Sequence, residues 1–263
     1  MRTALTLACS NTSGGAGIQA DLKTFAAHGV FGLSALTAIT AQNTLGVMRA
    51  SAVDPDLVAA QIDAVAADLP IHATKIGMLA NAGVIEAVAA AIERHRLPNV
   101  VLDPVMIAKS GAALLDPAAV DALRARLLPL ADVVTPNAPE AAALTGQPVT
   151  SLADLRRAAA TLVERGARAA LLKGGHLSGP AVDVLWDGRT FTELSAGRIE
   201  SRHTHGTGCT LSSAIAARLA LGDDLAAAVR AAKSYVTRAI AEAPGLGHGH
   251  GPLQHFPSGI DIR

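Results

Sequence analysis

The sequence predicts an α/β fold in which helices cover both faces of a mainly parallel β-sheet. Short apolar runs alternate along the chain with longer, alanine-rich stretches of helical periodicity. Strands that alternate with helices of about 10–15 residues are typical of parallel sheets. No Pro/Gly/Ser-rich linker and no run of like charges divides the 263 residues, half of which are hydrophobic. We therefore expect residues 1–263 to form a single domain with a large core.

The elements of the first half follow from the length and spacing of the apolar runs. Short runs predict strands, and longer runs with apolar residues three or four positions apart predict helices. In Pro55–Asp68, for example, Leu57, Val58 and Ile62 have helical spacing. The predicted order is the strand Thr3–Cys9, the helix Ala16–His28, the strand Gly32–Ala41, the helix Pro55–Asp68, the strand Ala73–Ile76, the helix Ala82–His95 and the strand Val100–Leu102.

The second half continues the same alternation and adds a hairpin. Asp187-Gly188 between two apolar runs is a turn signal, and the Gly- and His-rich tail Gly245–Pro252 predicts a loop. The predicted order is the helix Pro117–Arg126, the strand Val133–Val134, the helices Pro139–Thr145 and Leu152–Arg165, the strand Ala169–Leu172, the hairpin strands Val182–Trp186 and Thr190–Leu194, and the helices Gly208–Leu221 and Leu225–Ala241.

Composition and charge argue against several classes of function. The formal net charge is zero and aromatic residues make up 2% of the chain, so nucleic acid is not an expected partner. Cys9 and Cys209 lie far apart in the sequence, which predicts free thiols in a reducing compartment. The apolar run at the N-terminus is too short for a signal peptide, and no run of about 18 apolar residues predicts a membrane span. We therefore expect a soluble, cytoplasmic protein.

The unusual residues of the sequence, polar side chains together with glycines and a methionine, cluster directly after the predicted strands. In parallel α/β sheets, ligands bind at the carboxyl ends of the strands, because those ends meet at one edge of the sheet. The residues at these positions are Asn11–Gly17, Gln42, Gly77, Met78, Asp103, Asn137 and Lys173. We expect the binding site at this edge.

The first glycine-rich segment, Ser13–Ala20, follows a strand and contains Gly15-x-Gly17-x-x-Ala20. This spacing matches the dinucleotide-binding fingerprint, which also needs an acidic residue at the end of the second strand. The second strand ends instead at the amide Gln42, which argues against a nicotinamide site. Two other interpretations remain. One is a tight turn in which glycine lets backbones pack, and the other is a polar lid over a small substrate, with Asp21 in the first helical turn.

The second glycine-rich segment, His205–Thr210, opens a predicted helix. Its glycines let N–H groups point outward, and the helix dipole adds positive potential, which suits a transferring phosphoryl group. Cys209 lies at the helix N-terminus, where we expect the thiol pKa to fall. The competing interpretation is an ordinary capped helix with a buried cysteine. The chain has no Gly-Lys dipeptide, so an ATP site here would not use a P-loop.

Three further residues have both a structural and a functional interpretation. Lys173 precedes two glycines and is either a solvated strand end or a phosphate contact. Asn137 has the pattern of a helix N-cap with Pro139 in the first turn, and capping is the simpler interpretation. Asp103 fits a turn as well as a site. The spacing of the Cys and His residues does not match a structural zinc site.

Together these segments resemble the ribokinase-like superfamily and, within it, the bacterial hydroxymethylpyrimidine/phosphomethylpyrimidine kinases of thiamin biosynthesis. The resemblance extends from Ala4 to about Phe256. It rests on ordered segments at matching intervals, which are Ser13–Phe25, Ala41–Thr44, Lys75–Leu79, Asp103–Met106, Lys109–Gly111, Thr135–Asn137, Leu172–His176, Thr204–Thr210 and Gly247–Pro252.

The resemblance implies a fold and a reaction. The fold is a ribokinase-like three-layer α/β/α sandwich with a central, mainly parallel sheet, often assembled as a homodimer. The reaction uses ATP and Mg²⁺ to phosphorylate 4-amino-5-hydroxymethyl-2-methylpyrimidine (HMP) to its monophosphate and then to the diphosphate.

The resemblance also implies roles for individual residues. Gln42 matches the pyrimidine-binding Gln of the family, and its amide can form two hydrogen bonds with an aminopyrimidine edge. Cys209 matches the catalytic base. The residues implied in substrate binding are Gln42, Ala16, Asp21, Met78 and Val105, and those implied in the anion hole and in catalysis are Gly206, Thr207, Gly208, Cys209 and Lys173. ATP binding is implied for Lys173, Asn137, Thr207 and Lys233, and metal binding for Asp103 and Glu140.

One segment departs from the family pattern. The family usually has Ser-Asp-Pro-Ser or Ser-Asp-Ser-Ser where this chain has Ser10-Asn11-Thr12-Ser13. An amide replaces a carboxylate, although Asn still forms local turns through its side chain. Three alternative functions remain, namely a pyridoxal kinase of the same superfamily, a pyrimidine sensor without turnover, and a nicotinamide oxidoreductase.

Overall fold

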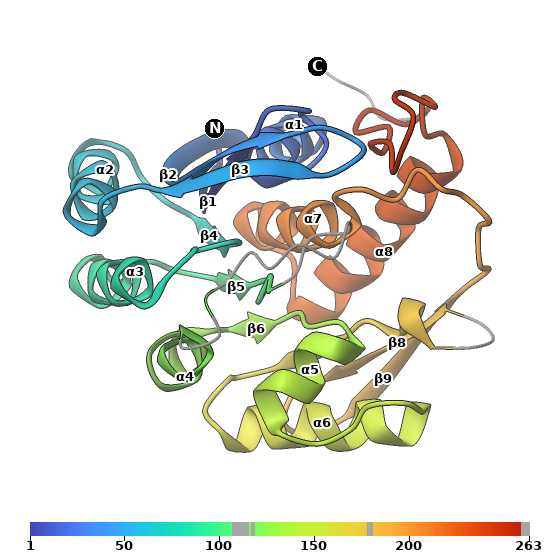
Figure 1. Ribbon diagram of the computed structural model, residues 1–263. Helices are drawn as coiled ribbons and strands as arrows, with labels where there is room; N and C mark the ends of the chain where they lie inside the picture. The colour runs from blue at the N-terminus through green and yellow to red at the C-terminus, as the bar shows by residue number, and fades with distance from the viewer. Residues whose placement is uncertain (107–115, 117–118, 178–180, 259–263) are drawn as a thin grey trace.

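The computed structural model describes residues 1–106, 116, 119–177 and 181–258. In this part of the chain one nine-stranded sheet runs in the order β3-β2-β1-β4-β5-β6-β7-β8-β9 (Figure 1). The strands are β1 (Thr3–Asn11), β2 (Phe31–Gln42), β3 (Val47–Ala52), β4 (Ala73–Ile76), β5 (Val100–Leu102), β6 (Val133–Val134), β7 (Ala170–Leu172), β8 (Ala181–Trp186) and β9 (Phe191–Ala196).

The central strands run parallel, and the sheet becomes antiparallel at both edges. β1 pairs in parallel with β2 and β4, and parallel pairing continues through β5, β6 and β7. β3 pairs antiparallel with β2, and β8 and β9 form an antiparallel hairpin at the other edge. The hairpin turns at Asp187-Gly188, where Gly188 has a φ of 85° that glycine adopts without steric cost. The predicted hairpin is therefore confirmed.

The edge strand β3 has no counterpart among the predicted elements. Five of its six residues are exposed, so it has no buried apolar face. Strand prediction relies on apolar alternation, and an exposed edge strand carries little of that signal. Pairing with β2, from Ala38 opposite Ala52 to Gln42 opposite Val47, holds β3 in place.

The helices begin and end close to the predicted positions. Side chains of Asp54, Asn81, Asn137, Ser151 and Asp224 cap five of them at the N-terminus. In the described residues the helices are α1 (Gly17–Ala27), α2 (Pro55–Asp68), α3 (Ala82–His95), α4 (Ala119–Ala122), α5 (Ala138–Thr145), α6 (Leu152–Glu164), α7 (Thr207–Leu221) and α8 (Leu225–Ala241). Among these helices none has the length and apolar character needed to cross a membrane.

The helix predicted over Pro117–Arg126 differs most from the structure. Pro117 lies outside the described residues. The described part is the short α4, followed by a π-helical turn at Leu123–Leu127 and a 3₁₀ turn at Leu128–Leu130. Pro129 lies in the 3₁₀ turn and has no N–H to continue a helix, which gives a physical reason for the end of this segment.

Helices on both faces divide the core into two layers (Figure 1). One layer lies under α2, α3, α5 and α6 and includes Ile62, and the other lies under α1, α7 and α8 and includes Phe25. Because alternate strand residues point to opposite faces, β1 contributes Leu5 and Leu7 to the first layer and Ala4 to the second. The predicted three-layer α/β/α arrangement with a mainly parallel sheet is confirmed.

Candidate active site

A cavity of about 660 Å³ opens at the carboxyl ends of the parallel strands, at the edge that the sequence predicts. Its walls come from the ends of β1 and β2, from the residues that follow β4, β5, β6 and β7, and from α7 and α8. Nearly every residue assigned from the sequence lines it. These are Ala16, Gln42, Met78, Asp103, Val105, Asn137, Glu140, Lys173, Gly206, Thr207, Gly208, Cys209 and Lys233.

Two glycine-rich turns meet beside the cavity. Gly17 begins α1 with a φ of 58°, and a Cβ there would clash with the carbonyl oxygen of Cys9. Gly206 caps α7 with a φ of 82°, and a Cβ there would clash with the carbonyl oxygen of Gly15. Only glycine permits both the positive φ and the close approach. The structure therefore supports the tight-turn interpretation of Ser13–Ala20, and it brings the starts of α1 and α7 together.

Cys209 lies in the first turn of α7, and its sulfur accepts a hydrogen bond from the N–H of Gly17. The predicted fall in its pKa is wrong. Burial raises the pKa of the Cys209 thiol to about 11, and Lys75 is the strongest opposing influence. The carboxylates of Asp21 and Asp103 add to the rise. Loss of hydration of the thiolate therefore outweighs the helix dipole at this position.

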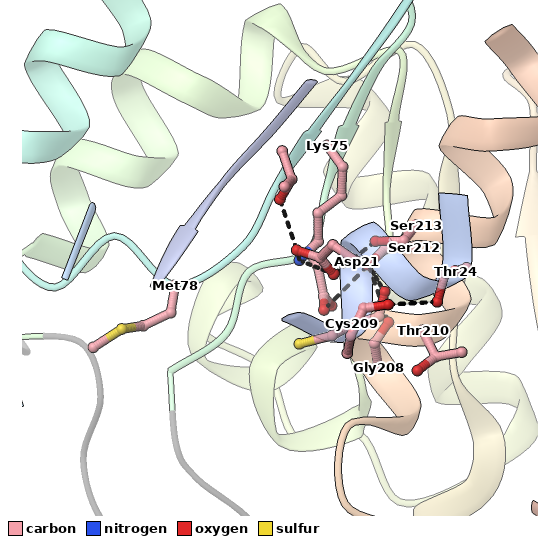
Figure 2. Close-up of polar contacts among 12 residues, drawn as sticks. Asp21, Thr24, Lys75, Met78, Gly208, Cys209, Thr210, Ser212 and Ser213 are labelled. Carbon is pink, nitrogen blue, oxygen red and sulfur yellow. Dashed lines mark hydrogen bonds and ion pairs between the residues drawn. The ribbon is translucent and has the colours of Figure 1, made fainter. Parts of the chain in front are cut away.

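Asp21 does not line the cavity, so its predicted place around the substrate is corrected. It is fully buried and lies in the second turn of α1, not the first. Its carboxylate pairs with Lys75 at 3.0 and 2.9 Å (Figure 2). It also accepts hydrogen bonds from the hydroxyls of Thr6 at 2.6 Å and Ser213 at 2.7 Å. A buried ammonium needs a counter-charge, and Asp21 supplies it behind the cavity wall.

One end of the cavity, at the ends of β1 and β2, carries two amide side chains and an imidazole. The amide nitrogens of Asn11 and Gln42 lie 2.9 and 3.5 Å from Nε2 of His205. Oδ1 of Asn11 accepts hydrogen bonds from the N–H and the hydroxyl of Ser13, at 2.9 and 2.6 Å. The expected local turn at Asn11 is therefore confirmed. We refer to Asn11, Gln42 and His205 as the neutral end, after the uncharged amides of the first two.

Apolar side chains complete the lining of the cavity. Met78 is buried in a small cluster with Cys9 and Ala38, and Val105 packs against this cluster. Cys9 is thus a small buried residue of β1. Met78, Val105 and Ala16 face the cavity and give it an apolar wall suited to a ring.

The other end of the cavity, below β5, β6 and β7, is charged. Nζ of Lys173 lies 2.9 Å from Oδ1 of Asp103 and 3.8 Å from Oε2 of Glu140. The Lys173 side chain is 14% exposed, so it is not a solvated strand end. Burial raises the pKa of Glu140 to about 7, and Lys173 only partly offsets this effect. We refer to Asp103, Glu140 and Lys173 as the charged end.

Asn137 caps α5, as the sequence predicts. Its Oδ1 accepts the N–H of Glu140 at 2.9 Å, and Oε2 of Glu140 accepts the N–H of Asn137 at 2.8 Å. This reciprocal capping box holds both side chains where the helix begins. Both residues also line the cavity, so capping and a role in the site are compatible.

Sequence reasoning missed Asp183 and His205 as site residues. Lys233 of α8 donates hydrogen bonds to Oδ2 of Asp183 at 2.7 Å and to the carbonyl of Ala181 at 3.0 Å. Asp183 is a buried acid within the apolar strand β8, and that break in the pattern is the signal that could have indicated it. For His205, the sequence signal that could have indicated a site residue is its position directly before Gly206.

The described residues contain no group of three or more His, Cys, Asp or Glu side chains arranged to hold a metal ion. Asp103 and Glu140 offer two carboxylates, which is fewer than a complete protein site. The segment Lys109–Gly111, which carries part of the family resemblance, lies outside the described residues.

Comparison with known proteins identifies the family. The family model described as phosphomethylpyrimidine kinase matches residues 11–254. A hydroxymethylpyrimidine/phosphomethylpyrimidine kinase from Synechococcus elongatus is 51% identical over 255 residues, which cover 96% of this chain and 97% of that protein. The thiamine biosynthesis bifunctional protein ThiED of Geobacter sulfurreducens is 52% identical over 260 residues. That match covers 98% of this chain but 53% of ThiED, so the chain spans about half of its length.

A solved structure extends the similarity to the fold. An ADP complex of pyridoxal kinase from Bacillus subtilis matches with a TM-score of 0.90 and 40% identity, covering 97% of each chain. The family match spans the segments that build the cavity, from Asn11 through the first turn of α7 to Lys233 on α8. The chain belongs to the phosphomethylpyrimidine kinase family.

Proposed function

We propose that this chain transfers phosphate from ATP to HMP and then to HMP monophosphate, which gives the diphosphate for thiamin biosynthesis. The observation that carries the proposal is that one cavity joins Gln42 at the neutral end with Lys173 and the first turn of α7. An aminopyrimidine and a phosphoryl donor thus find matching groups in one space. Membership of the family and the names of the relatives support the same activity.

Recognition of the pyrimidine is proposed to rest on Gln42. Its carbonyl can accept a hydrogen bond from the 4-amino group, and its amide can donate to the adjacent ring nitrogen. Met78, Val105 and Ala16 line the same cavity and offer apolar surface to the ring.

The phosphates are proposed to lie at the start of α7 and at the charged end. Phosphoryl transfer depends on positioning and on charge neutralisation. The N–H groups of Gly208 and Cys209 belong to the first helical turn, whose N–H groups have no partner within the helix. A Cβ on Gly208 would be 3.3 Å from Nζ of Lys173, so the ammonium lies beside this turn. The remaining proposed nucleotide contacts are Thr207, Asn137 and Lys233.

Cys209 is proposed as the base of the first phosphorylation. As the hydroxymethyl oxygen bonds to phosphorus, its proton passes to the Cys209 sulfur, and the bond from phosphorus to the ADP oxygen breaks. With a pKa of about 11, the thiolate that accepts this proton is the minor form at neutral pH. The acceptor of the second phosphorylation is already an anion and needs no base.

Asp103 and Glu140 suit a magnesium ion that is also bound to substrate. Mg²⁺ prefers oxygen ligands and is commonly held by one or two protein carboxylates, with water and phosphate oxygens completing its shell. The two carboxylates share Lys173 as a counter-charge, so both face the same small space. Bound Mg²⁺ would neutralise charge on the transferring phosphates.

A transfer assay with HMP, HMP monophosphate and pyridoxal side by side tests the proposed function. We expect both pyrimidines to be phosphorylated with release of ADP. Failure to consume ATP with any of the three acceptors would contradict the proposal and would favour a pyrimidine-binding protein without turnover.

Pyridoxal is the second candidate acceptor, because the Bacillus subtilis pyridoxal kinase is 40% identical across 97% of this chain. The two acceptors differ in the ring edge that Gln42 would contact. We expect a higher kcat/KM for HMP than for pyridoxal, and the reverse order would reassign the enzyme.

We also propose that the chain is a single domain that assembles as a homodimer. All strands of the described residues belong to one sheet, which supports one structural unit. Ile39, Leu45 and Met48 are 55, 65 and 66% exposed on or beside the edge strand β3. Exposed apolar groups at an unpaired sheet edge favour association. Light scattering after size-exclusion chromatography should give twice the chain mass of 26.6 kDa, and a monomer mass would contradict the dimer.

A further inference from the structure

Lys75 is a fully buried ammonium group that the reaction steps above do not use. It lies in β4, beside β1 in the middle of the sheet. Ala73, two positions earlier, packs into the layer under α1 and α7, so Lys75 points to the same side. A Cβ on Gly77 would be 2.6 Å from Nζ of Lys75, so glycine leaves the room that the ammonium occupies.

The ion pair of Lys75 with Asp21 is sealed from water. Both side chains have 0% exposure, and Nζ lies 3.0 and 2.9 Å from the two carboxylate oxygens. Such a pair adds little to the stability of the fold, because replacing it with apolar side chains of similar volume often leaves stability unchanged or increases it. Stability alone is therefore a weak reason for a charge at this depth.

The pair is connected to the helix turn that carries Cys209. Oδ1 of Asp21 accepts a hydrogen bond from Ser213 at 2.7 Å. Ser213 lies one turn after Cys209 on α7, and residues at this spacing share a helix face. Figure 2 shows Asp21 between Lys75 and this part of α7. The ammonium of Lys75 is thus held behind the start of α7 by the carboxylate of Asp21.

We propose that Lys75 is a positioning residue for HMP phosphorylation, because it fixes a positive charge behind the first turn of α7 and thereby favours the thiolate of Cys209. This inference rests on the proposed role of Cys209 as the base. Lys75 keeps its proton throughout, and the proton of the acceptor hydroxyl passes to the Cys209 sulfur. Lys75 itself touches neither substrate nor the reacting atoms.

Charged groups of both signs act on the Cys209 thiol. Lys75, on β4, lowers the pKa of the thiol more than any other group does, and Cys209 in turn raises the pKa of Lys75. Asp21 on α1 and Asp103 after β5 act in the opposite direction. The thiol also interacts with groups on two further strands or strand ends, Cys9 and Lys173. Removing Lys75 is therefore the change expected to suppress the thiolate most.

The test measures the thiolate directly, so its failure can be distinguished from a failure of the kinase assignment. In a Cys9→Ala background Cys209 is the single remaining thiol. Its rate of alkylation by iodoacetamide at a fixed pH below its pKa is proportional to the thiolate fraction. Lys75→Met keeps the shape of the side chain and removes its charge. We expect alkylation and kcat for HMP to fall about tenfold, equivalent to one pKa unit, while KM and the rate on HMP monophosphate change little.

A matched control separates charge from packing. Thr74→Val changes the neighbouring buried residue of β4 without altering charge, and the Thr74 hydroxyl has no hydrogen-bond partner among the described residues. This variant should alkylate at the wild-type rate, and slowing equal to that of Lys75→Met would overturn the proposal in favour of packing.

A double variant keeps the test decisive if Lys75→Met leaves an unpaired carboxylate that prevents folding. Lys75→Met/Asp21→Asn removes both charges and retains the shape of the pair. Because Asp21 opposes Lys75 with a smaller effect, we expect alkylation slower than wild type but faster than in the single variant. A wild-type rate in folded Lys75→Met, or a double variant that alkylates as fast as Asp21→Asn alone, would show that Lys75 does not act on Cys209.

Discussion

The neutral end and the charged end of the cavity stand at one edge of the same sheet but differ in the forces that organise them. At the neutral end, the amides of Asn11 and Gln42 converge on His205. At the charged end, the ammonium of Lys173 lies within 3.8 Å of a carboxylate oxygen of Asp103 and of Glu140. Directional hydrogen bonds from uncharged amides suit the edge of an uncharged ring, whereas phosphates require charge.

Because of this difference, we expect substitutions at the two ends to affect different kinetic parameters. Substitutions at the neutral end should alter KM for the pyrimidine and leave the pH dependence unchanged. Substitutions at the start of α7 or at the charged end should alter kcat or its pH dependence. Cys209 lies in the first turn of α7 and lines the cavity, and in the proposed complex this turn faces the phosphates while the Cys209 sulfur faces the acceptor hydroxyl.

The largest effect is expected for Cys209→Ala. Loss of a general base should slow HMP phosphorylation by roughly 10²–10⁴-fold. Phosphorylation of HMP monophosphate should fall far less, because its acceptor oxygen is already anionic and the backbone N–H groups of α7 remain. Steady-state rates for both acceptors on wild type and variant measure the difference. Equal losses on the two acceptors would mean that Cys209 shapes the anion hole and does not act as a base.

Gln42→Glu should have the next largest effect and should act on binding alone. The carboxylate cannot donate to the pyrimidine ring nitrogen, and a mispaired buried polar group costs roughly 1–3 kcal/mol. We expect KM for HMP to rise accordingly, with KM for ATP unchanged. Initial-rate kinetics with each substrate varied in turn check this. An unchanged KM for HMP would remove Gln42 from the site.

The pH dependence of the two reactions should differ by up to about tenfold per pH unit. Because burial raises the pKa of Cys209 to about 11, the thiolate fraction increases with pH across the neutral range. The rate on HMP should therefore rise with pH relative to the rate on HMP monophosphate. Groups at the charged end should affect both reactions alike, so above about pH 7, where the acceptor phosphate is already fully ionised, the ratio of the rates isolates Cys209. A ratio independent of pH would contradict base catalysis by the thiol.

Sequence periodicity predicted most of the fold, because buried elements carry the pattern from which they are recognised. The bounds of α2, α3 and α8 match the predicted ones at both ends, since each helix has an apolar face. β3 could not be found in this way, because its exposed residues are held by backbone pairing and not by side-chain burial.

The site could be predicted as a set of residues but not as an electrostatic environment. Gly206–Cys209 indicated a helix N-terminus, and a helix dipole is a local property of the sequence. The rise in the Cys209 pKa depends on desolvation by elements that are distant in sequence. Asp21 was misplaced for the same reason, because its partner Lys75 is 54 positions away and local sequence does not show the pairing.

Asn11→Asp probes the neutral end with the smallest expected effect. Oδ1 of Asn11 accepts the N–H of Ser13, so its amide nitrogen faces His205 and donates to Nε2. A carboxylate oxygen at that position cannot donate, and the imidazole must then carry a proton on Nε2. The same ring nitrogen could no longer accept from the amide of Gln42, which lies 3.5 Å away. The consequence should reach the pyrimidine through the orientation of Gln42.

We expect Asn11→Asp to be tolerated and to change KM for HMP by about two- to tenfold, the usual value of one hydrogen bond. The ratio of the two phosphorylation rates and its pH dependence should stay at wild-type values, because the substitution leaves Cys209 and the charged end untouched. Ser13→Ala, which removes a hydroxyl bonded to Asn11 without adding charge, is a suitable control. Loss of activity in a folded Asn11→Asp variant, or a shifted pH profile, would show that the two ends of the cavity are coupled through this loop. Recognition of the pyrimidine at the neutral end and phosphate transfer at the charged end would then not be separable in this enzyme.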